Sequence, residues 1–108
     1  MVVPIREVLR AAARALGVEP ALHLATAREI WPRIAGPALA GLSAPVTLRG
    51  RRLLVGVTHE AAGGEIRLRR AEIVAALARE LGEGAITDVT PVARRRLPDR
   101  GSGRGKAR

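Results

Sequence analysis

The segment that decides the fold is PVTLRGRRLLVGV, residues 45–57. Apolar residues, several of them β-branched, lie on both sides of the turn Arg49-Gly50-Arg51-Arg52, and a glycine in such a turn favours a hairpin. We therefore expect antiparallel strands at residues 45–48 and 53–57. The turn also brings three arginines together at the tip of the hairpin.

A long helix is expected after the hairpin, over residues 61–81. Its apolar face consists of Ala62, Ile66, Ile73, Val74, Leu77 and Leu81. Arg70 falls within that face, so its side chain must reach solvent or find a partner. Residues 86–90 include β-branched side chains and predict a third strand, which is expected to end at Pro91.

Two amphipathic helices are expected before the hairpin. Residues 4–16 place Ile5, Val8, Leu9, Ala12 and Leu16 on one face, and residues 21–34 place Leu24, Ala27, Ile30, Trp31 and Ile34 on another. Pro32 lacks a backbone donor, so a kink or a restart is expected at this point. A short helical piece should follow over residues 36–42.

The predicted fold class is α+β, in the order α-α-β-β-α-β, with one helix layer on a small three-stranded sheet. One domain over residues 1–93 accounts for the pattern, because 108 residues support no more than one. Residues 94–108 lack periodicity and combine Gly and Ser with like charge, so we expect a disordered basic tail there.

The charge distribution indicates a polyanionic partner. The net charge is +9, and residues 94–108 hold seven of the 19 basic residues but a single acid. The hairpin tip and the tail together supply the candidate nucleic-acid contacts: Arg49, Arg51, Arg52, Arg94, Arg95, Arg96, Arg100, Arg104, Lys106 and Arg108. Because no element to read base edges is recognisable, binding should be largely independent of sequence.

The sequence contains few residues or motifs that indicate catalysis, metal binding or cofactor binding. The chain has no cysteine, which excludes thiol catalysis and a zinc ribbon. His59-Glu60 begins like the zinc-protease helix motif, but Gly63 stands where the second histidine belongs. There is no Gly-x-x-Gly loop, and Trp31 is the only aromatic residue, so base stacking on a sheet face is not expected. We expect a binding module with no metal or cofactor.

No targeting segment is recognisable. No apolar run reaches the roughly 20 residues that span a bilayer, and the N-terminal residues lack the order of a signal peptide. The expected location is the cytoplasm, in association with the nucleoid.

An ordered set of residues resembles the DciA family. The resemblance begins with a motif at Trp31-Pro32-Arg33-Ile34-Ala35-Gly36, Leu39-Ala40 and Ser43-Ala44-Pro45. It continues through Leu48, Gly50, residues 53–57, residues 65–69, and Leu77 with Leu81-Gly82, and covers about residues 1–92. Trp31, Gly36 and Pro45 are the motif residues to which we assign a structural role.

The resemblance implies a KH-like domain without the Gly-x-x-Gly loop. It further implies a factor that engages the bacterial replicative helicase and binds single-stranded or forked DNA. One departure is notable: Ala62 stands where the family usually has a second tryptophan, near the start of the long helix. Two alternatives remain open, namely a general nucleic-acid-binding protein without a helicase partner, acting on RNA or DNA, and a structural adaptor whose tail only confers solubility.

Overall fold

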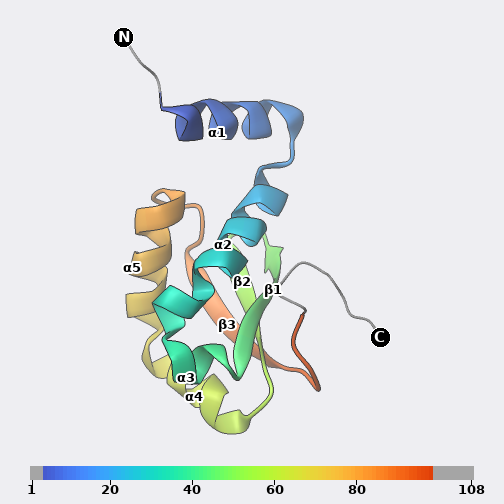
Figure 1. The fold of residues 1–108 in the computed structure, drawn as a ribbon, viewed down its shortest axis with the longest axis vertical. Coiled ribbons are helices and arrows are strands. Elements are labelled where there is room, and N and C mark those ends of the chain that lie inside the picture. Colours follow the sequence, from blue (N-terminus) through green and yellow to red (C-terminus); the bar gives the residue numbers. More distant parts are fainter. Residues whose placement is uncertain (1–3, 99–108) are drawn as a thin grey trace.

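The structure is a computed structural model that describes residues 4–98 (Figure 1). It contains five helices and three strands within those residues: α1 Ile5–Leu16, α2 Glu19–Ala35, α3 Pro37–Ala40, β1 Ser43–Arg49, β2 Arg52–Val57, α4 Glu60–Leu68, α5 Arg70–Leu81 and β3 Asp88–Ala93. The predicted α+β class and element order are confirmed. Residues 99–108, most of the predicted tail, lie outside the described residues.

The three strands form one mixed sheet in the order β1-β2-β3. β1 pairs with β2 antiparallel, and β2 pairs with β3 parallel. The hairpin is tighter than the sequence suggests, because Arg49 pairs with Arg52 and leaves only Gly50 and Arg51 in the turn. Gly50 has φ +61°, in the left-handed region that glycine adopts without strain.

The helices cover one face of the sheet. Figure 1 shows α2 crossing the sheet with α5 beside it, and α2, α4 and α5 all contact strands. Alternation along β2 separates the two faces: Leu53 and Val55 are buried under the helices, whereas Arg52 and Leu54 point to the opposite face. No helix within residues 4–98 packs on that second face, which we call the helix-free face.

Trp31 is the centre of the core and is 1% exposed. Its indole Nε1–H donates to Ser43 Oγ at 3.0 Å, and the Ser43 hydroxyl donates to the Leu39 carbonyl at 2.6 Å. The bonds join α2, α3 and the first residue of β1. Because Ser43 is fully buried, this chain of bonds satisfies polar groups that would otherwise be costly to bury.

The prediction of one continuous helix over residues 61–81 is wrong. The chain breaks at Arg69, which has φ −99° and ψ 15° and separates α4 from α5. The Arg69 guanidinium donates to the carbonyls of Ile34 and Ala35 at the end of α2, both at 2.9 Å. These tertiary bonds satisfy two of the orphan carbonyls of α2, and hydrophobic periodicity carries no signal for them.

Two proline predictions also need correction. A restart at Pro32 is not observed, since α2 runs through to Ala35; Pro32 lies in the last turn, where its missing N–H removes a single helical bond. β3 does not end at Pro91 but continues to Ala93. Proline is tolerated there because β3 is an edge strand.

α1 forms as predicted, but its apolar face is not part of the core. Only Ala13 is buried, while Ile5, Leu9 and Leu16 are between 56% and 76% exposed. Polar contacts hold α1 near the remaining helices, including a hydrogen bond from Arg10 Nη2 to the Glu80 carbonyl at 3.2 Å. The core is therefore built without α1.

Replacement of Trp31 tests the importance of this core. Trp31→Ala should lower the free energy of unfolding by roughly 3–5 kcal/mol, because a large cavity remains. Ser43→Ala should cost about 1–3 kcal/mol, since the buried indole N–H loses its acceptor. Urea denaturation of the three proteins measures both values, and a Trp31→Ala protein as stable as the parent would contradict the core assignment.

Candidate nucleic-acid interface

Four arginines surround an open concavity of about 690 Å³ at the hairpin end of the helix-free face. Two come from the hairpin strands, one from the turn and one from the start of α5. A single acid accompanies them. We call this the arginine concavity, and it is lined by Arg49, Arg51, Arg52, Leu54, Arg70, Thr87 and Asp88.

Backbone pairing positions these side chains. Arg49, Arg52 and Asp88 occupy one rung across the sheet, because Arg49 pairs with Arg52 and Arg52 with Asp88. The Arg51 carbonyl accepts the Thr87 N–H at 2.8 Å and fixes the turn beside the start of β3. Arg70 reaches the same place from the first residue of α5, which the chain break before it makes possible.

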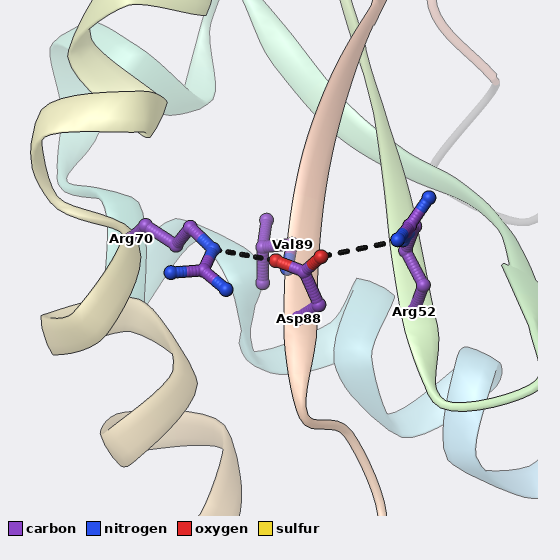
Figure 2. A network of polar contacts seen from close by, with 4 residues as sticks. All are labelled: Arg52, Arg70, Asp88 and Val89. Atoms are coloured by element: carbon purple, nitrogen blue, oxygen red, sulfur yellow. Dashed lines mark hydrogen bonds and ion pairs between the residues drawn. The ribbon is translucent and has the colours of Figure 1, made fainter.

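Asp88 is the electrostatic centre of the arginine concavity (Figure 2). Its pKa lies below the ordinary aspartate value, chiefly because Arg70 donates a hydrogen bond to the carboxylate; the Val89 N–H and the Arg52 charge act in the same direction, and burial opposes them. Since the folded pKa is lowered, the contribution of Asp88 to folding is present above about pH 4 and is lost as the pH falls through the folded pKa. At neutral pH Asp88 is charged.

Arg94 lies on the same face, towards the opposite end of the sheet. Its N–H donates to the Val57 carbonyl at 2.9 Å. Its side chain passes over Gly56: a Cβ added at Gly56 would approach Arg94 Cγ and Val46 Cγ1 to 3.0 Å each. Gly56 and Arg52 point to one face of β2, about 13 Å apart along the strand.

The structure thus brings the hairpin tip and the first tail arginine onto one face of the sheet. Arg95 and Arg96 are exposed beyond the end of β3. The remaining predicted tail contacts lie outside the described residues: Arg100, Arg104, Lys106 and Arg108.

The sequence did not identify two charged members of the arginine concavity, Arg70 and Asp88. Arg70 was recognised only as a charge on an apolar face in need of a partner, and Asp88 only as part of a strand. The partner of Arg70 is Asp88, 18 residues further along the chain. That pairing depends on how α5 packs on β3, which local sequence patterns do not encode.

The three family-motif residues lie away from the arginine concavity. Trp31 and Pro45 are fully buried, and Pro45 pairs with Val55 across the hairpin. Gly36 has φ +87° and ψ 158° at the junction of α2 and α3, a conformation that strains other residues. All three occupy packing or turn positions.

Metal and membrane sites are not found in the part of the chain that the structure describes. No cluster of three or more potential metal ligands occurs within residues 4–98. His59 precedes α4, and its Nδ1 lies 3.2 Å from Thr58 Oγ1. Among the described helices, none has the length and apolar character to cross a bilayer.

Neutralising the hairpin arginines tests the arginine concavity. The triple change Arg49→Gln, Arg51→Gln and Arg52→Gln should weaken binding to a single-stranded oligonucleotide and reduce the salt slope of log affinity by roughly 2, as expected for three lost phosphate contacts. A matched variant neutralises Arg6, Arg33 and Arg79, which do not line the concavity. Fluorescence anisotropy across salt concentrations compares them, and equal losses in both variants would contradict a localised interface.

Comparison with known proteins identifies the family. None of the curated proteins searched matches the chain. The sequence model of the DciA family, described as Dna[CI] antecedent, matches residues 4–90. This match covers most of the chain and includes the whole of the helix layer, the hairpin and the start of β3. The chain therefore belongs to the DciA family.

Proposed function

We propose that this protein is a non-enzymatic accessory factor of DNA replication that engages the replicative helicase and binds DNA through basic residues. Membership of the DciA family supports the helicase-associated role in replication. The observation that carries the DNA-binding part is the arginine concavity, where four arginines and one acid line one open surface. Such an excess of guanidinium groups favours binding to the phosphates of a nucleic-acid backbone. The expected location of such a factor is the cytoplasm, in association with the nucleoid.

The chemistry of the surface suits the DNA backbone rather than the bases. Arginine forms paired hydrogen bonds to phosphate oxygens, and the open concavity accepts an extended strand. No aromatic side chain is available for base stacking, because Trp31 is buried. Binding is therefore expected to vary little with base sequence and strongly with salt.

The basic tail starts at the far end of the same face. It continues from Arg94, which the sheet holds through the Val57 carbonyl. A strand in the arginine concavity would thus have a further cation, Arg94, available on the same face. This arrangement supports cooperation of the hairpin tip and the tail on one nucleic-acid strand.

Removal of residues 99–108 separates the two contributions. These residues hold four of the seven tail cations, and the truncated protein keeps Arg94, Arg95 and Arg96. If the full chain neutralises five phosphates, the slope of log affinity against log salt should be about −3.5, and the truncation should flatten it to about −2. Anisotropy titrations measure both slopes, and an unchanged slope would remove the tail from the interface.

Helicase engagement requires its own experiment. The purified protein and the cognate replicative helicase should elute together in size-exclusion chromatography without nucleic acid, and nuclease treatment should leave the complex intact. The arginine triple variant should still co-elute, because it alters only the DNA surface. Oligonucleotide binding without co-elution would instead favour the alternative of a general nucleic-acid-binding protein, and neither activity would favour the adaptor.

A further inference from the structure

Asp88 receives two arginines, one on each carboxylate oxygen. Arg70 Nε donates to Oδ1 at 2.5 Å from α5, and Arg52 Nε lies 3.3 Å from Oδ2 on β2 (Figure 2). Oδ1 also accepts the Val89 N–H at 2.8 Å. Both carboxylate oxygens therefore have partners, and the carboxylate pairs with guanidinium groups from two different elements.

Arg52 and Arg70 each contact Asp88 through the Nε atom of the side chain. Each places Nε against Asp88, in a hydrogen bond from Arg70 and in an ion pair from Arg52, and within residues 4–98 neither donates a hydrogen bond from Nη1 or Nη2. An arginine has five N–H donors, so four remain on each side chain. The Nη edge is one that forms paired bonds to a phosphate.

The neighbouring Arg69 uses its donors in the opposite way. Its Nη1 and Nη2 donate to the carbonyls at the end of α2, so the Arg69 side chain joins two parts of the fold. The side chains of Arg52 and Arg70 are 58% and 55% exposed, while that of Asp88 is 24% exposed. Ion pairs this exposed contribute little to folding, so their geometry calls for another explanation.

We propose that Asp88 is a positioning residue for nucleic-acid binding, which holds Arg52 and Arg70 by Nε so that their Nη edges receive neighbouring phosphates of one strand. The inference rests on the DNA-binding part of the proposed function and adds to it a role for the Asp88 carboxylate. Holding the side chains in place before binding reduces the conformational entropy that is lost when the strand binds. The ligand is the phosphodiester backbone, contacted at the rim of the arginine concavity.

The sign of one substitution separates positioning from simple electrostatics. Asp88→Asn removes a negative charge from a surface that binds a polyanion, so charge alone predicts tighter binding. Positioning predicts the reverse, because an amide holds two guanidinium groups far less well than a carboxylate does. We expect a loss of about fivefold in affinity for a single-stranded oligonucleotide at fixed salt, as two side chains regain freedom.

Glu65→Gln serves as the matched control. Glu65 is exposed on α4, does not line the arginine concavity and forms none of the ion pairs seen within residues 4–98. Its neutralisation should leave affinity unchanged or raise it slightly. Thermal unfolding of Asp88→Asn checks the fold, and Arg70→Lys provides a second variant, which keeps the charge but loses the Nε anchor and the paired donors and should also bind more weakly.

Three outcomes of the binding measurements decide whether Asp88 positions the arginines. Weaker binding by both Asp88→Asn and Arg70→Lys, with Glu65→Gln unaffected, supports the inference. If Asp88→Asn binds as tightly as Glu65→Gln or tighter, the positioning role is overturned while DNA binding stands. If the unmodified protein binds no oligonucleotide at low salt, both the inference and the DNA-binding proposal fail.

A competition experiment shows whether the arginines bind a nucleic-acid strand or a free phosphate ion. Inorganic phosphate should displace the oligonucleotide no better than chloride at equal ionic strength, because isolated ions cannot occupy neighbouring positions as a linked strand does. Displacement at low millimolar phosphate that chloride does not reproduce would assign the arginines to a free phosphate and overturn the proposed strand contact.

Discussion

The hydrogen bond from the Trp31 indole to Ser43 is the contact on which the remaining structure depends. It is buried, and it joins α2 to the first residue of β1, while the Ser43 hydroxyl continues to the end of α3. The chain has no other aromatic residue, so no second side chain of that size can define how α2 lies on the sheet. With β1 fixed in this way, the hairpin extends towards solvent and carries its arginines to one end of the molecule. The family motif that includes Trp31 therefore determines where the basic surface lies without contacting it.

Backbone groups at both edges of the sheet are partly occupied, which disfavours the addition of a further strand. On β1, Arg28 donates to the carbonyls of Pro45 and Val46, each at 3.1 Å. On β3, the Val89 N–H donates to the Asp88 carboxylate. Pro91, two residues later on the same edge, has no backbone N–H to donate. Since the helices cover one face, the helix-free face is the open face of the sheet. The same aspartate engages an N–H at the β3 edge and pairs with two arginines.

Local patterns in the sequence were sufficient for the fold class and the order of helical and strand segments, because burial on one face imposes a period on each helix and strand. They also identified Trp31 as a core residue and the hairpin arginines as a basic cluster. They failed where a distant group decides the outcome. Arg69 divides the long helix by bonding to the end of α2, and Arg70 finds Asp88 only after α5 has packed against β3. That Arg52 and Arg94 share a face follows from strand register and from Gly56, which no single segment encodes.

The central claim is that nucleic acid contacts the helix-free face. Amide chemical-shift mapping of the full chain with a short single-stranded oligonucleotide tests it most directly. The account predicts the largest changes at residues 49–52, at Leu54, at the Arg70 and Asp88 pair and around Arg94, with small changes along α2 and α3. Changes concentrated on α2 and at the α4–α5 junction, with the hairpin tip unaffected, would contradict it.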